Sequence, residues 1–179
     1  MAKTYNTFTN VATGDVYTAA SHNAILTNVN NYRVPPSCQV RRTTNLTGYT
    51  SDAAITWESE AFDTDDMWAS SPNPTRITIA TAGLYLVTFS GKVDATATLT
   101  LAHANMSVNG NLVTGQFGSV LSNVTSRFTL STLLNLAAND YITCAVGLVG
   151  GSAYIINGSA TAQDSTQTRC TVTWLGQVS

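Results

Sequence analysis

Polar and apolar residues alternate with a period of two along most of the chain after residue 36. The alternation is clear in residues 76–79, 98–101 and 169–174, where Thr, Val and Ile are frequent, and it is typical of strands with one buried face. Turn-forming residues separate such segments at positions 71–74, 82–83, 109–110, 138–140, 150–151 and 157–158. Short strands at this spacing predict an all-β antiparallel sandwich of about eight strands between residues 37 and 178.

The segment before residue 36 has a helical period instead. Its apolar positions recur every three or four residues after Thr18, which is a good N-cap. This apolar stripe consists of Ile25, Leu26, Val29 and Tyr32, with His22 one turn earlier. A helix of about three turns is marginal on its own in water, so the stripe needs its own domain, symmetry copies or a larger structure as a partner.

Two consecutive prolines follow the predicted helix. Pro35 and Pro36 favour an extended and stiff connector. We therefore expect residues 1–36 to form an anchoring arm and residues 37–179 to form the domain that the arm carries. The alternative is a helix that packs back on this domain.

One strand of the predicted sandwich is apolar on both faces. In residues 84–89, two leucines point to one side, and a tyrosine, a valine and a phenylalanine point to the other. The opposite sheet can cover one side, while a neighbouring subunit or the strand's own loops must cover the second. We favour a neighbouring subunit, because residues 142–149 are also apolar on both faces. The expected interface residues are Tyr85, Val87, Phe89, Cys144, Val146 and Trp174.

The charge content excludes several classes of protein. Charged residues make up 10% of the 179 residues, against roughly 25% in a typical soluble protein, which argues against intrinsic disorder. Lys and Arg total 8 and the net charge is -2, so we expect no nucleic-acid partner. The sequence has no apolar run long enough for membrane insertion. The first residues also lack the apolar stretch of a signal peptide, so we expect synthesis in the cytoplasm.

The sequence offers little that could perform catalysis. It has two histidines, His22 and His103, and it lacks the common zinc, phosphate-loop and serine-hydrolase motifs. We therefore expect no catalytic residue, no cofactor and no enzymatic activity.

Five of the ten Asp and Glu residues lie close together, in residues 58–66. Asp63, Asp65 and Asp66 are weak candidates for calcium ligands, because Ca²⁺ prefers oxygen donors. The spacing nevertheless lacks the central glycine and distal glutamate of an EF-hand loop. The alternative is a solvated turn with three apolar anchors, Phe62, Met67 and Trp68.

The three cysteines are too dispersed to form a disulfide framework. Cys38, Cys144 and Cys170 lie in apolar or alternating stretches, so we expect buried free thiols. A single bridge between Cys38 and Cys170 is the alternative if their strands are neighbours.

Several segments resemble C1q/TNF-like domains, in the order in which they occur in that family. Residues 75–89 are similar to its strand, Ala-Gly turn and tyrosine-bearing strand, and residues 106–110 to its apolar strand that ends in Asn-Gly. Residues 130–146 resemble its leucine-rich strand, turn and apolar strand, although Asn139 stands where the family commonly has glycine. Residues 171–176 resemble its terminal strand in an altered form.

Two further segments resemble a narrower group. Residues 61–68, with the strand that follows them, look most like C1q-like domains of tailed-bacteriophage structural proteins, and residues 14–30 resemble the helical leader found before such domains. The resemblance implies a jelly roll of about eight to ten strands, a homotrimer and a place on the virion exterior. The helix would then dock on a tail protein or the major capsid protein.

Two roles are open for such a virion protein. The favoured role is host attachment as a tail or fibre component that contacts a cell-surface polymer, and the alternative is capsid decoration. Attachment predicts exposed aromatic residues on distal loops, for which the candidates are Tyr49, Trp57, Trp68 and Tyr154. A soluble C1q-like binding protein or lectin is the alternative from another class.

Overall fold

The computed structural model of the chain describes residues 2–6, 15–48, 52–95, 101–118, 125–149, 154–161 and 167–178. Within these residues, one helix, α1 (Ala19–Arg33), precedes eleven strands. The strands are β1 (Ser37–Arg41), β2 (Leu46–Thr47), β3 (Ser59–Asp63), β4 (Ile77–Thr78), β5 (Gly83–Ala95), β6 (Leu101–Val108), β7 (Asn111–Gly118), β8 (Thr125–Leu136), β9 (Tyr141–Val149), β10 (Tyr154–Ile156) and β11 (Arg169–Gly176).

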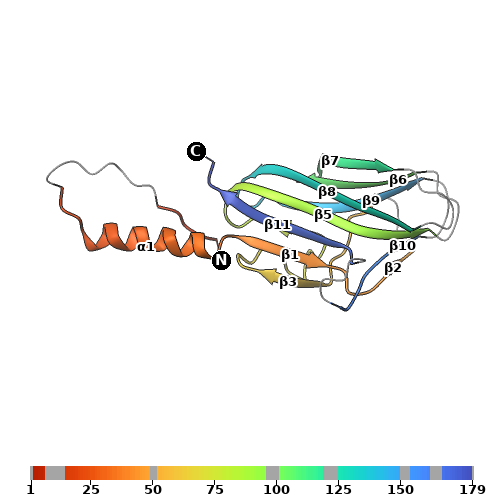
Figure 1. Cartoon of the computed structure of the whole chain (residues 1–179), viewed down its shortest axis with the longest axis horizontal. Helices are drawn as coiled ribbons and strands as arrows, with labels where there is room; N and C mark the ends of the chain where they lie inside the picture. The colour runs from red at the N-terminus through yellow and green to blue at the C-terminus, as the bar shows by residue number, and fades with distance from the viewer. Residues whose placement is uncertain are drawn as a thin grey trace.

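The strands form two antiparallel sheets that lie in two layers (Figure 1). In the larger sheet, β3, β1, β11, β5 and β8 lie side by side. The short strand β10 pairs with the far end of β5 on one side and with β2 on the other. The smaller sheet has the order β4, β9, β6 and β7. The predicted antiparallel sandwich is thus confirmed. The strand number exceeds eight partly because β2, β4 and β10 have only two or three residues, too few for an alternating pattern to show.

The turn between β6 and β7 shows how local sequence sets the register of a hairpin. Asn109 and Gly110 have φ values of 52° and 81°, which the two-residue hairpin turn requires and which Asn and Gly adopt most readily. Asn109 also accepts a hydrogen bond at Oδ1 from the backbone N–H of Tyr141, at 3.0 Å. The predicted Asn-Gly turn is confirmed, and it is tied to β9.

The core lies between the two sheets, and it corrects the prediction for β5. Tyr85, Val87 and Phe89 were predicted to face a neighbouring subunit, but their side chains are 0% exposed within a single chain. Leu84 and Leu86 point to the other side of β5, where Leu86 is 38% exposed. A period of two shows which residues share a face, but it does not show which face is turned inward.

The remaining predicted interface residues are also inside the protomer. Cys144 and Val146 of β9 point into the same core. Trp174 of β11 is 4% exposed and lies beneath Tyr5, with the two rings stacked at a centroid distance of 4.8 Å. None of the six predicted residues is therefore available to a second subunit.

The helix begins where the sequence places it. The hydroxyl of Thr18 accepts a hydrogen bond from the backbone N–H of Ser21 at 3.1 Å, which is the N-cap interaction. No residue of α1 is buried, and the helix extends beyond one end of the sandwich along its long axis (Figure 1). The connector is fixed to the sandwich, because the carbonyl of Pro35 accepts from Thr64 Oγ1 at 2.7 Å and that of Pro36 from the backbone N–H of Trp174 at 3.0 Å.

We expect Phe89→Ala to lower the free energy of unfolding by about 3–5 kcal/mol, because it leaves a cavity between the sheets. The ring of Phe89 lies 6.2 Å from that of Trp57 and 4.8 Å from that of Phe128. Urea denaturation measures the change. The matched control is Leu112→Ala on β7, where the side chain is 65% exposed and the change should stay within about 0.5 kcal/mol. Equal losses in the two variants would contradict this placement of the core.

Candidate functional site: an exposed sheet face and a helical arm

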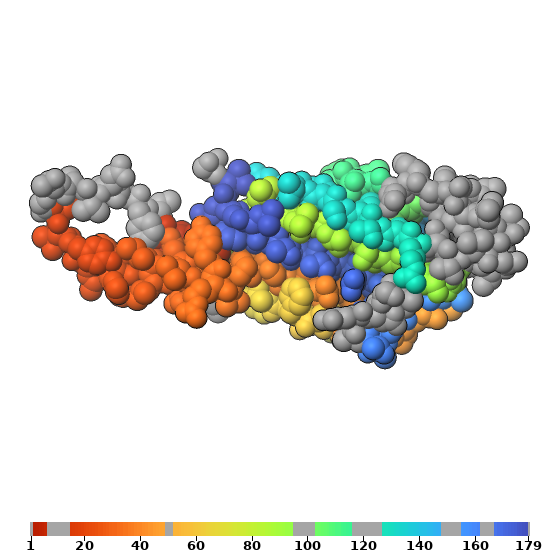
Figure 2. Space-filling view, in the orientation of Figure 1, coloured from red at the N-terminus to blue at the C-terminus, as the bar shows by residue number. Residues whose placement is uncertain are grey.

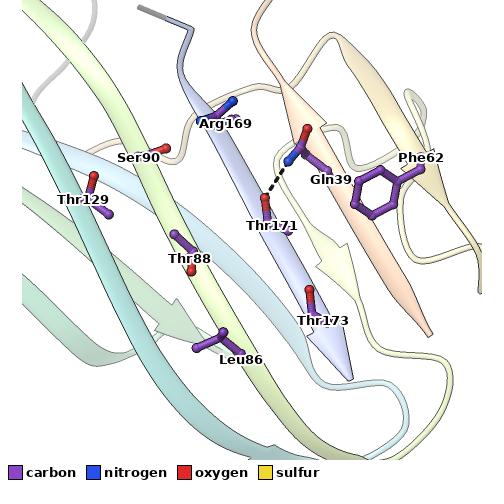
Figure 3. Close-up of a pocket in the computed structure, with 9 residues that line it drawn as sticks. All are labelled: Gln39, Phe62, Leu86, Thr88, Ser90, Thr129, Arg169, Thr171 and Thr173. Atoms are coloured by element: carbon purple, nitrogen blue, oxygen red, sulfur yellow. Dashed lines mark hydrogen bonds between the residues drawn. The ribbon is translucent and has the colours of Figure 1, made fainter. Parts of the chain in front are cut away.

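The outer side of the larger sheet forms a broad surface, which we call the sheet face, and its cationic side chains, Arg41, Lys92, Arg127 and Arg169, lie toward the end away from α1. It is the side of β3, β1, β11, β5 and β8 that points away from the core, and it contains an open groove of about 700 Å³ (Figure 3). The residues that line the groove are Gln39, Phe62, Leu86, Thr88, Ser90, Thr129, Arg169, Thr171 and Thr173. Arg169 carries the one charge among these nine.

Apolar side chains lie on the sheet face beside hydroxyls that already have partners. Leu86 and Leu133 are register partners on β5 and β8, and Leu133 is 58% exposed. Gln39 Nε2 donates to Thr171 Oγ1 at 2.8 Å (Figure 3). The hydroxyls of Thr88 and Ser131 are bonded to each other at 3.0 Å. Because burying a polar group costs less when it is already hydrogen-bonded, this face is suited to contact with another protein surface.

The arm is joined to the sandwich by a cluster of three aromatic rings. Tyr5 stacks on Trp174, and Tyr32 of α1 lies 5.4 Å from the ring of Tyr5 and 5.6 Å from that of Trp174 between ring centroids. Such ring pairs add about 0.5–1.5 kcal/mol beyond the burial of their area. The cluster fixes the end of α1 nearest to the sandwich.

Residues 2–6, which we call the N-terminal strap, cover one side of α1. Asn28 Nδ2 donates to the carbonyl of Asn6 at 2.8 Å, and Asn28 Oδ1 accepts from the backbone N–H of Asn6 at 2.8 Å. Asn31 Nδ2 donates to the carbonyl of Thr4 at 2.6 Å. Two of the four asparagines of α1 thus bind the strap, a role that helical periodicity alone could not reveal.

Three of the predicted anchoring residues, Ile25, Leu26 and Val29, are left open by the strap, whereas Tyr32 packs against Tyr5 of the strap. Ile25, Leu26, Val29 and Tyr32 are between 40% and 57% exposed. The sandwich does not pack over this stripe, except that the ring of Tyr32 meets the aromatic cluster at its base. The stripe remains a predicted contact surface, and α1 does not fold back on the domain.

Asp65 lies under the strap and is completely buried. Burial raises the pKa of its carboxyl group, and the neighbouring Thr81, the amino terminus and Lys3 offset only part of this effect. The backbone N–H of Lys3 donates to Thr81 Oγ1 at 2.7 Å, and the hydroxyl of Tyr85 donates to the carbonyl of Thr81. Burial, with smaller contributions from Tyr32 and Asp65, also raises the pKa of Tyr5 to about 12.

The three calcium candidates do not converge on one point. The carboxylate of Asp63 accepts from the backbone N–H groups of Asp65 and Trp68, at 3.0 and 2.8 Å, so it closes the turn. Asp65 is enclosed and Asp66 is exposed. The part of the chain that the structure describes contains no group of three His, Cys, Asp or Glu side chains that could hold a metal ion. Of the three expected apolar anchors, Met67 and Trp68 pack on the core, whereas Phe62 is 42% exposed on the sheet face.

An ion pair between the buried Arg42 and the more exposed Glu58 was not predicted from the sequence. Arg42 Nη2 lies 2.8 Å from Glu58 Oε1, and Glu58 also accepts hydrogen bonds from Thr43 and Thr44. Burial alone would raise the pKa of Glu58, but the bonds from Thr44 and Thr43 and the charge of Arg42 together lower it. The pair fixes the loop after β1, and residues so far apart in sequence carry no local signal of this contact.

A second polar cluster, around His103, lies on the smaller sheet. His103 Nε2 lies 2.9 Å from Asp52 Oδ1, and Asn105 Nδ2 donates to the same oxygen at 2.8 Å. The cluster ties the segment at Asp52 to β6, which is a structural role.

Of the four aromatic residues predicted on distal loops, the structure describes the side chains of Trp57 and Trp68, and that of Trp57 is not accessible. Trp57 is 2% exposed, and half-buried Trp68 donates its indole N–H to the carbonyl of Pro74 at 3.1 Å. The prediction of an exposed Trp57 is therefore wrong, because this ring fills the core beside Phe89. Tyr49 and the side chain of Tyr154 lie outside the described residues.

The cysteines are buried free thiols, as predicted. Cys38, Cys144 and Cys170 all lie in the core, and the alternative bridge between Cys38 and Cys170 is not formed. Burial is the main reason why the pKa of the Cys38 thiol lies far above its ordinary value. Among the described helical residues, there is no segment with the length and hydrophobicity of a membrane span.

We expect Asp65→Asn to remove a pH dependence of folding stability. Because the pKa of Asp65 is raised in the folded state, the unfolded chain ionises first, and wild-type stability falls as the pH rises above the ordinary value of 3.8. The amide cannot ionise, so the variant should gain stability relative to wild type between pH 4 and pH 7, as measured by urea unfolding. Asp66→Asn, at an exposed position of the same turn, is the control and should follow wild type. An unchanged pH profile in Asp65→Asn would contradict the burial of a charged carboxylate here.

Comparison with known proteins supports the fold and no more specific identity. No family model and no curated protein matches the sequence. The globular domain of the zebrafish complement 1qA protein is similar in structure, with a TM-score of 0.57 and 10% identity over 80% of this chain and 99% of that one. The Eiger TNF of S. frugiperda is also similar, with a TM-score of 0.60 and 12% identity over 80% of this chain and 94% of that one. The chain has the C1q/TNF-like jelly-roll fold.

Proposed function

We propose that this protein is a non-enzymatic structural protein that assembles as a homotrimer through the sheet face. The observation that carries the proposal is the composition of this face, where Leu86, Leu133 and Phe62 are exposed beside hydroxyls that already have hydrogen-bond partners. Charge is depleted and apolar side chains are enriched at the centres of protein interfaces. A trimer is the assembly that the resemblance to C1q/TNF-like domains implies.

The trimer stands on the virion exterior in this proposal, with the arm as the attached end. The resemblance of residues 61–68 and 14–30 to tailed-bacteriophage structural proteins supports this location. The arm leaves one end of the sandwich and keeps an apolar stripe exposed (Figure 1), as a docking element would. Its partner on the particle is a tail protein or the major capsid protein.

Host attachment through a cell-surface polymer is the leading role, and it would use the end of the sandwich away from the arm. Capsid decoration is the second candidate. It is favoured by the burial of Trp57, which removes one of the aromatic residues that a polymer-binding loop would offer. A decoration protein needs no such residues.

We expect the wild-type protein to have three times its monomer mass of 18.9 kDa in light scattering at micromolar concentration. Leu86→Arg should weaken assembly at least 100-fold, because it places an unpaired charge in a dehydrated interface. Leu112→Arg introduces the same charge at an exposed position of β7 in the smaller sheet and should remain trimeric. A wild-type monomer, or equal effects of the two variants, would contradict assembly through the sheet face.

Labelling the protein in images of assembled phage particles tests its location. Label at the tail tip is the result expected for host attachment, and label across the shell is the result expected for capsid decoration. Purified particles that contain none of this protein would overturn the virion role altogether.

A further inference from the structure

We infer that the apolar stripe of α1 is covered by the same helix of the other two subunits, so that the three arms form a parallel three-helix bundle. This inference rests on the proposed trimer and specifies which partner covers the apolar stripe of the arm. It assigns an interaction surface to Ile25, Val29 and Tyr32, and the partner is a further copy of this chain.

The spacing of the stripe is that of a coiled-coil seam. His22, Ile25, Val29 and Tyr32 follow one another at intervals of three, four and three residues, which are the a and d positions of a heptad repeat. Leu26 extends the seam on one flank. Val29 at an a position and Ile25 at a d position are both β-branched, and β-branched residues at both positions favour three or more strands over two.

One flank of the stripe is already occupied. The N-terminal strap binds α1 through Asn28 and Asn31, while the side chains of Ile25 and Val29 stay 40% and 47% exposed. The strap thus binds the flank beside Asn28 and leaves Ile25, Leu26 and Val29 as the surface for association. In Figure 2 the helix projects beyond the sandwich, so the described strands of its own chain cannot reach the middle of the stripe.

Charge does not oppose a bundle of identical helices. Residues 16–32 contain no Asp, Glu, Lys or Arg, so three parallel copies in register bring no like charges together. A heterologous partner is commonly selected by complementary charges, and this helix offers none along the stripe. A surface without charge whose apolar residues follow the coiled-coil period is complementary to itself.

The stripe also adjoins the proposed trimer interface in the chain. α1 ends at Arg33 and β1 begins at Ser37, and Pro35 and Pro36 between them are bonded to the sandwich. Gln39 of β1 lines the groove on the sheet face. Association through this face therefore brings the three fixed connectors, and the helices before them, to the same end of the assembly.

Cysteine cross-linking of the full-length protein tests the bundle. Val29→Cys places a thiol in the seam, and Thr27→Cys places one at an exposed position of α1 away from it. The native thiols are buried and should not react. After mild oxidation with oxidised glutathione, we expect at least tenfold more disulfide-linked dimer for Val29→Cys than for Thr27→Cys on non-reducing gels, and Ile25→Cys should behave like Val29→Cys.

Light scattering on the same samples separates the two proposals. A trimeric mass with strong cross-linking at positions 25 and 29 supports the bundle. A trimeric mass with no cross-linking there, or with equal cross-linking at position 27, overturns the bundle, leaves the trimer standing and assigns the stripe to a different protein. A monomeric mass overturns both proposals.

Discussion

The central strand β5 has apolar side chains on both faces, and only one face fits between the two sheets. The sandwich encloses Tyr85, Val87 and Phe89, the face with the two aromatic rings, which removes the larger apolar area from water. Leu84 and Leu86 are left on the outside, in the middle of the sheet face. The stability of the protomer and the association that we propose for its outer surface thus both depend on one strand.

Period-two alternation predicted the antiparallel sandwich, and helical spacing with Thr18 as the N-cap predicted α1 and its start. These features could be predicted because the signals that determine them are local. The sequence could not predict which side of β5 faces inward, because this depends on the volume that β9 and β11 leave between the sheets. The prediction that Trp57 is exposed was wrong for the same reason, since its ring completes the packing around Phe89.

The arm shows a similar division between local and long-range information. The apolar stripe could be read from the sequence, but the strap could not, because it depends on hydrogen bonds between residues more than twenty positions apart. The strap gives two asparagines of α1 a structural role. Asparagines lower the intrinsic helix propensity, yet Asn28 and Asn31 bind residues 4–6 while Ile25, Leu26 and Val29 stay exposed.

In the proposed trimer, the sheet face and the stripe favour association in different ways. The sheet face offers a wide area with few strong contacts, whereas the stripe offers a narrow seam with a defined register. Neither surface alone specifies a trimer strongly, because flat hydroxyl-rich sheets tolerate several alignments and a helix of 15 residues is short for a coiled coil. Because the connector at Pro35 and Pro36 is held to the sandwich, alignment of one surface sets the alignment of the other. The short seam then needs to supply the register of the assembly, while the larger face supplies its area.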